Sequence, residues 1–147
     1  MIKIICVGKI NQKYLKEGIA YYVKQIPQKV EIIEVLDEAS LLGMEAEGQR
    51  ILSKIKSSDY VVTLEILGKM FDSEGFAKML DEQMTYVQGD LVFVIGGSYG
   101  LSDEVKERSQ MKISFSKMTF PHQLMRLILV EQIYRGFMIL KNHPYHK

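Results

Sequence analysis

The sequence contains one cysteine, three prolines and no tryptophan among its 147 residues. Cys6 therefore has no partner for an internal disulfide, and a thiolate cluster for zinc or iron and sulfur is excluded. Charged residues interrupt every apolar run before the roughly 18 to 20 positions that a membrane span requires. The first run ends at Gly8 without the small-residue cleavage site of a secretory signal. We therefore predict a cytoplasmic protein without membrane segments.

The remaining composition is that of an ordinary globular chain, with 47% hydrophobic and 25% charged residues. Its length predicts a single domain over residues 1–147, since domains average about 150 residues. The net charge is only +1, but the charge is unevenly distributed. Residues 73–107 hold two basic and seven acidic residues, whereas residues 108–147 hold seven basic residues against Glu131 alone. This asymmetry indicates that a polyanion such as RNA would be attracted to the C-terminal part.

Five apolar, β-branched runs alternate with stretches of helical periodicity, which predicts an α/β fold with a mostly parallel sheet and flanking helices. The predicted strands span residues 2–7, 30–36, 60–66, 91–95 and 112–116. The run 91–95 is apolar at every position, so we expect it at the centre of the sheet. The predicted helices are 12–25, 44–55, one capped by Ser73, one capped by Ser102, and 121–141. Gly68 is expected to end the third strand, and Pro121 to be the first helical residue of the last helix.

The last predicted helix carries apolar side chains at nearly every angle around its axis. One face of a sheet covers only one side of a helix. A second copy of the chain is the simplest cover for the rest, so we predict a homodimer through this helix.

The glycines after the fourth strand, at positions 96, 97 and 100, do not form a dinucleotide-binding or phosphate-binding motif. The helix that follows begins with Asp103 and Glu104, which disfavour a pyrophosphate at that point. A tight turn with a positive φ is therefore the preferred interpretation, and a Rossmann-type nucleotide enzyme is the less favoured alternative. His143 and His146 lack further ligands in sequence, so we predict no metal site.

The segment Ser-Phe-Ser-Lys-Met-Thr-Phe-Pro-His (114–122) places bulky side chains among hydroxyls where a strand passes into a helix. Such a joint suits an adenine ring held between apolar walls by main-chain hydrogen bonds. Ordinary core packing is the alternative, and spacing does not separate the two.

Several segments, taken together and in order, resemble the RlmH (YbeA) type of ribosomal RNA methyltransferase. They are Val-Gly-Lys (7–9), Glu-Gly-Gln-Arg-Ile-Leu (47–52), Thr-Leu-Glu-Ile (63–66), Val-Ile-Gly-Gly-Ser-Tyr-Gly-Leu (94–101), Ser-Phe-Ser-Lys-Met-Thr-Phe-Pro-His-Gln (114–123), Glu-Gln-Ile-Tyr-Arg (131–135) and Asn-His-Pro-Tyr-His-Lys (142–147). The resemblance covers the whole chain. The connection over residues 36–44 looks shorter than is usual in that family, which affects any RNA contact made there.

The resemblance implies a SPOUT-type fold with a C-terminal trefoil knot, although general folding rules would predict an ordinary open sheet. It also implies a homodimer that transfers a methyl group from S-adenosylmethionine to N3 of a pseudouridine in 23S ribosomal RNA. The cofactor residues that it implies are Leu64, Gly96, Phe115, Ser116, Lys117, Met118, Thr119 and Phe120.

For the acceptor side, the resemblance points to His122, Tyr145 and His146 as catalytic residues. Arg126, Arg135 and Lys147 are the candidate contacts to RNA, in free 23S rRNA or in the assembled ribosome. An RNA-binding module that uses the same basic tail without any chemistry is the second alternative.

Overall fold

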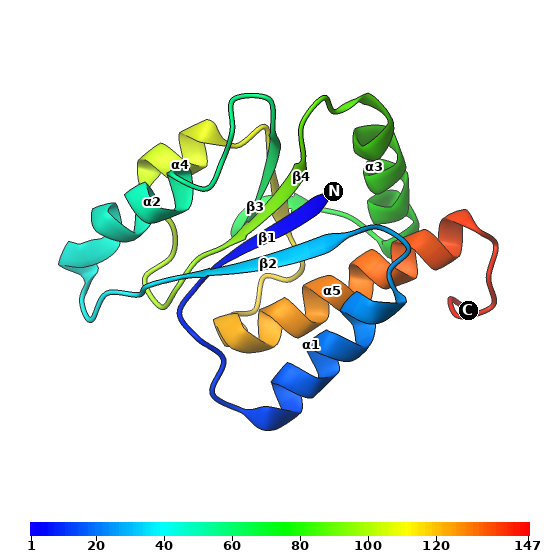
Figure 1. Ribbon diagram of the computed structural model, residues 1–147, viewed down its shortest axis with the longest axis horizontal. Coiled ribbons are helices and arrows are strands. Elements are labelled where there is room, and N and C mark those ends of the chain that lie inside the picture. The colour runs from blue at the N-terminus through cyan, green and yellow to red at the C-terminus, as the bar shows by residue number, and fades with distance from the viewer.

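The computed structural model describes all residues 1–147 and contains a five-stranded parallel sheet flanked by helices (Figure 1). The strands are β1 (Ile2–Val7), β2 (Val30–Val35), β3 (Tyr60–Met70), β4 (Leu91–Ile95) and β5 (Met111–Ser114). The α-helices are α1 (Lys13–Gln25), α2 (Met44–Leu52), α3 (Ser73–Tyr86), α4 (Asp103–Arg108) and α5 (His122–Leu140), with a short 3₁₀ helix η1 (Leu41–Gly43) before α2. The predicted α/β class and the parallel sheet are confirmed.

The strands lie in the order β2-β1-β4-β3-β5, so β4 is central as predicted. Alternate side chains of β4 enter two separate cores, because successive residues of a strand point to opposite faces. Phe93 joins the core under α1, α3 and α5, whereas Val92 and Val94 join the core under α2 and α4. Helices thus cover both faces of the sheet, which explains the uninterrupted apolar run of this strand.

The third strand does not end at Gly68 as predicted. Both Leu64 and Lys69 pair with Ile113 of β5, so the residues between them form an irregularity within β3. A Cβ at Gly68 would lie 2.6–2.8 Å from backbone atoms of Ile113, and only glycine permits this close approach. The glycine therefore shapes a bulge inside the strand, and the strand continues to Met70.

Several helix boundaries differ from the predictions. The N-cap of α3 is Asp72, whose carboxylate accepts from Gly75 N at 2.7 Å, and the predicted cap Ser73 is the first helical residue. Pro121 was predicted as the first helical residue of α5, but it is the N-cap, and the helix begins one residue later at His122. The predicted end of α2 was too late, since the helix stops at Leu52. The cap Ser102 of α4 is confirmed, with its side chain accepting from Val105 N.

Helix α5 lies on the sheet between α1 and α3, and close helix contacts hold it there. Gly136 faces Leu80 and Ala77 of α3, and Gly18 of α1 faces Leu127. These neighbours cover part of the apolar circumference of α5 within one chain. None of the helices combines the length and the hydrophobicity that a membrane-spanning segment requires.

Candidate active site

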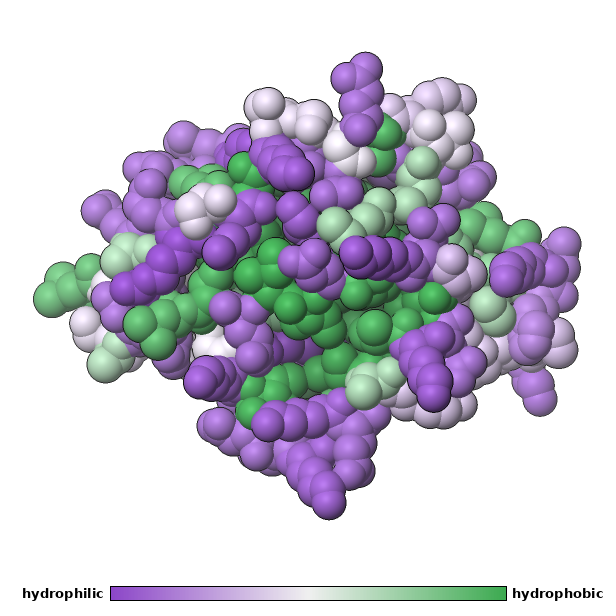
Figure 2. All heavy atoms as spheres, viewed as in Figure 1, coloured by the Kyte–Doolittle hydropathy of each residue, from purple (hydrophilic) through white to green (hydrophobic).

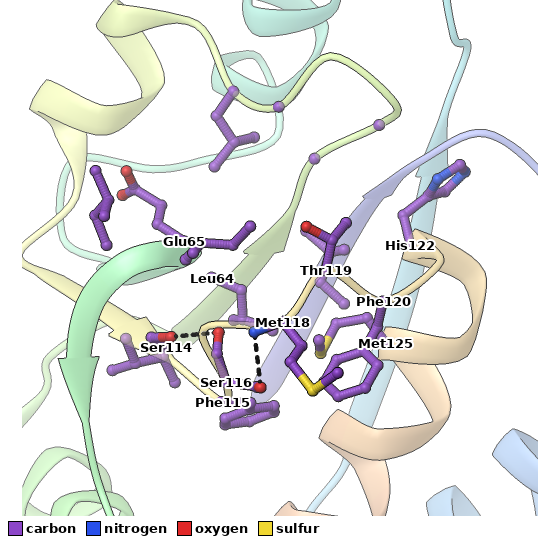
Figure 3. Close-up of a pocket in the computed structure, with 18 of the residues that line it drawn as sticks. Leu64, Glu65, Ser114, Phe115, Ser116, Met118, Thr119, Phe120, His122 and Met125 are labelled. Carbon is purple, nitrogen blue, oxygen red and sulfur yellow. Dashed lines mark hydrogen bonds between the residues drawn. The ribbon is translucent and has the colours of Figure 1, made fainter.

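A cavity of about 340 Å³ opens at the carboxyl edge of the sheet, beyond the ends of β4 and β5 (Figure 3). This is the edge where parallel sheets bind ligands, and the volume lies within the range of about 300–1,000 Å³ typical of small-molecule sites. Three segments supply most of the lining: the bulge of β3 (64–67), the glycine loop after β4 (95–101) and the joint between β5 and α5 (113–122). Lys106 of α4 and Met125 of α5 complete it.

Most of the predicted cofactor residues lie together in this cavity. They are Leu64, Gly96, Phe115, Ser116, Met118, Thr119 and Phe120. Lys117 is the exception, since it is exposed and does not line the cavity. Segments that are far apart in the chain thus form a single apolar pocket, and the predicted adenine-binding joint is one of its walls.

Two side-chain hydrogen bonds hold the joint in shape (Figure 3). Ser114 Oγ donates to the carbonyl oxygen of Ser116 at 2.9 Å, and Met118 N donates to Ser116 Oγ at 2.9 Å. Bonds of this local kind favour a turn over a continued strand. They explain why β5 stops at Ser114 although the prediction extended the strand to residue 116.

The glycine loop is a tight turn, as predicted from its composition, and it also forms part of the cavity wall. Gly100 has a φ of +84° and its N–H donates to the carbonyl oxygen of Gly97 at 3.1 Å. A Cβ at Gly96 would lie 2.9 Å from the backbone carbonyl of Gly100. The first glycine is therefore required by the packing of the loop and the last by its conformation.

His122 begins α5 and lines the cavity. Burial lowers the pKa of its imidazole below the ordinary value of 6.5, and the positive charge of Arg126 lowers that pKa further. Asp37 and Glu47 oppose this shift. The lowered pKa keeps the imidazole neutral near pH 7, in the form that can accept a proton.

Tyr145 and His146 do not lie near His122 in this chain. They fold back against the second half of α5, where Tyr145 packs on Tyr134 and His146 contacts Arg135. A rise of about 1.5 Å per residue places this part of the helix about 18 to 20 Å from His122. The Tyr145 ring packs on Tyr134 with centroids 4.7 Å apart, and Arg135 lies 4.8 Å from its centroid. Burial raises the pKa of the Tyr145 hydroxyl, so this group stays a hydrogen-bond donor at neutral pH.

The basic C-terminal part offers fewer free cations than its charge count indicated. Arg126 is 1% exposed and donates to Glu34 Oε2 at 2.6 Å and to the carbonyl oxygens of Val7 and Gly8 at 3.0 and 2.7 Å. This burial contradicts the prediction that Arg126 contacts RNA. Arg135 forms an ion pair with Glu131 and also donates to His146 Nδ1 at 3.1 Å, while Lys147 is exposed.

Two charged residues of the cavity were missed by sequence reasoning, Glu65 from the bulge and Lys106 from α4. Glu65 lines the pocket because the bulge turns its segment away from regular pairing with β5, and Gly68 was the local signal of that bulge. Lys106 carries no comparable signal, since only the packing of α4 beside the sheet brings it to the cavity.

These features agree with the comparisons to known proteins. The family model described as a predicted SPOUT methyltransferase matches residues 1–146. The chain belongs to this methyltransferase family. It is 58% identical over 146 residues to the ribosomal RNA large subunit methyltransferase H of Acholeplasma laidlawii, and the match covers 99% of each chain.

Solved structures share the fold at low sequence identity. A protein from Haemophilus influenzae assigned to a methylase family superposes with a TM-score of 0.58 at 11% identity, over 99% of this chain and 70% of that chain. A protein from Bacillus anthracis assigned as an RNA methyltransferase gives 0.53 at 13% identity, over 99% and 97%. Likeness at this level of identity extends to the fold alone.

Proposed function

We propose that this protein transfers a methyl group from S-adenosylmethionine to N3 of a pseudouridine in 23S ribosomal RNA of the large subunit. The observation that carries this proposal is the single pocket that gathers seven of the eight predicted cofactor residues together with His122. The methyltransferase family and the rRNA methyltransferase named among its relatives support it.

The pocket fits an adenosine with a sulfonium-bearing side chain. Ten of its 19 lining residues are hydrophobic, which suits the adenine ring, and the hydroxyls of Ser116 and Thr119 provide hydrogen-bonding groups. The acidic start of α4 disfavours phosphate, and S-adenosylmethionine has none. When bound, this cofactor supplies an electrophilic methyl group on sulfur.

We assign His122 as the group that accepts the N3 proton. The ring nitrogen of a uracil-like base must lose this proton, and a neutral imidazole at the edge of the pocket can take it. The lowered pKa of His122 supports the assignment. The protein otherwise holds the reacting groups aligned and away from water, which is the main requirement of an in-line transfer.

Tyr145 and His146 would reach such a site from a second copy of the chain. In the same chain these residues pack about 18 to 20 Å along α5 from His122, beyond the reach of a side chain, so a catalytic role for the tail requires a homodimer in which each tail closes the other pocket. Figure 2 shows a band of hydrophobic side chains across the face that carries α5 and β2, and this band supports self-association. Arg135 and Lys147 would then contact RNA beside the shared site.

Mixed dimers test this arrangement. His122→Ala and a chain that lacks residues 143–147 should each be inactive alone, since either change removes a group from both sites. Refolding the two together should restore activity, because one site of the mixed dimer receives an intact His122 and an intact tail. No recovery in verified mixed dimers would refute a tail that acts on the partner pocket.

The trefoil knot belongs to the same proposal. The joint between β5 and α5 lies against the bulge of β3 and the glycine loop in one pocket, and a knotted C-terminal part accounts for this convergence. The site of action that we propose is the cytoplasm, where ribosomes are assembled.

Mass spectrometry of 23S rRNA tests the function directly. Cells that lack the protein should lose one methyl group from a single pseudouridine, and purified protein with S-adenosylmethionine should restore it on ribosomes or on free rRNA. A well-folded protein that binds rRNA but shows no calorimetric binding of S-adenosylmethionine would instead favour an RNA-binding module. Tight binding of NAD in the same assay would favour a nucleotide enzyme.

A further inference from the structure

Glu65 and Lys106 form a charged pair in the lining of the pocket. Glu65 Oε1 lies 4.0 Å from Lys106 Nζ, and the two side chains are 15% and 41% exposed. The lining contains three ionisable residues, and these are Glu65, Lys106 and His122. Figure 3 shows Glu65 and His122 on opposite sides of the pocket.

The geometry of the pair leaves one carboxylate oxygen weakly satisfied. Thr63 Oγ1 donates to Glu65 Oε2 at 2.6 Å, which orients the carboxylate within β3. The other oxygen meets only Lys106, at the outer limit of an ion pair. Partly exposed pairs of this kind contribute roughly 0–1 kcal/mol, so a ligand can replace this contact at little cost.

The pair is complementary to an amino-acid group. An α-amino acid presents an ammonium and a carboxylate on one carbon, and the pocket presents a carboxylate beside an ammonium. The rest of the lining is mostly apolar and suits an adenine ring, whereas Lys106 marks a solvent-accessible end that suits a zwitterion.

We propose that Glu65 and Lys106 bind the amino-acid end of the methyl donor. The Glu65 carboxylate accepts hydrogen bonds from the α-ammonium, and the Lys106 ammonium pairs with the α-carboxylate. This inference rests on the proposed function and adds a specificity: the pocket distinguishes ligands that carry the amino acid from those that carry only the nucleoside.

Calorimetry with two ligands tests the pair. S-adenosylhomocysteine carries the amino acid, whereas 5′-methylthioadenosine keeps the adenine, the ribose and the thioether but lacks it. Glu65→Gln and Lys106→Gln should each raise the Kd of S-adenosylhomocysteine about tenfold, because each removes a charge-assisted bond. Neither change should alter the Kd of 5′-methylthioadenosine. Glu107→Gln, on the same helix but outside the lining, is the matched control and should leave both values unchanged.

Each other outcome has a defined meaning. Parallel weakening of both ligands in Glu65→Gln would place the carboxylate on the nucleoside and overturn the proposal, as would unchanged binding of S-adenosylhomocysteine in both variants. Lys106→Gln changes a half-exposed side chain and carries the same test if Glu65→Gln fails to fold. A wild-type protein that binds neither ligand would refute the proposed function itself, which is a separate result.

Discussion

Replacing Arg126 with methionine separates a structural role of this residue from the RNA contact that the sequence suggested. The variant removes the buried guanidinium from three acceptors, Glu34 Oε2 and the carbonyl oxygens of Val7 and Gly8. Methionine keeps an apolar side chain of similar length in the space that is left, so the change acts mainly on the polar contacts.

The loss of stability depends on which of the three acceptors can hydrogen-bond to water once the guanidinium is removed. The Glu34 side chain is 39% exposed and is rehydrated, whereas Val7 and Gly8 are buried and lose partners for their carbonyls. An unsatisfied buried acceptor costs about 1–3 kcal/mol. Removing a desolvated cation, whose Nε has no hydrogen-bond partner, offsets part of this loss. We expect the free energy of unfolding to fall by about 2–4 kcal/mol, which lowers the melting temperature by about 4–16 °C in a chain of this size.

Denaturant unfolding at one fixed protein concentration measures this change, since self-association would otherwise alter the apparent stability. Arg135→Met is the matched control on the same helix. Its ion pair with Glu131 is partly exposed, so we expect a loss of about 1 kcal/mol or less. The salt dependence of rRNA binding should be unchanged in folded Arg126→Met protein. Unchanged stability together with a salt slope reduced by about one would refute the structural role and support a phosphate contact.

Three further predictions concern the pocket and the core. Gly96→Ala places a Cβ 2.9 Å from the backbone of Gly100, so the loop must move and calorimetry should show about tenfold weaker binding of S-adenosylhomocysteine; an unchanged Kd would contradict this packing. His122 has a lowered pKa, so kcat/KM on ribosomes should fall only below pH 6.5, and Glu47→Gln, which removes a charge that raises this pKa, should shift the fall to still lower pH. A fall centred above pH 6.5 would argue against His122 as the base. Burial raises the pKa of the Cys6 thiol to about 12, so a thiol reagent at pH 8 should react only after unfolding, and rapid reaction of native protein would contradict its burial.

Local patterns were sufficient for most of the sheet. The run at 91–95 was assigned correctly at both ends and at the centre of the sheet, because a strand buried on two faces must be apolar throughout. The cap of α3 was assigned one residue too late, since Asp72 and Ser73 are both good caps and only the backbone conformation selects between them. Gly68 was taken as a break because its close contact is with Ile113, a residue 45 positions further along the chain.

The pocket depended on a different kind of information. The resemblance to a known family supplied residues such as Leu64 and Gly96, and the structure places them together with the joint at 115–120. Glu65 and Lys106 were not found, because they meet the pocket through a bulge and through the packing of a separate helix. Composition and residue spacing describe neighbours in the sequence, and they contain little information about contacts between distant segments.

The sequence alone determined the alternation of strands and helices, the central strand, the tight glycine turn and the uneven charge of the chain, because these depend on periodicity and on residue type within a few positions. Only the tertiary structure decided that Arg126 is a buried anchor and that the C-terminal tail packs about 18 to 20 Å along α5 from His122 in the same chain. Both facts depend on the segments of the chain that pack against α5 and on the length of this helix. No local pattern of residues specifies these tertiary contacts.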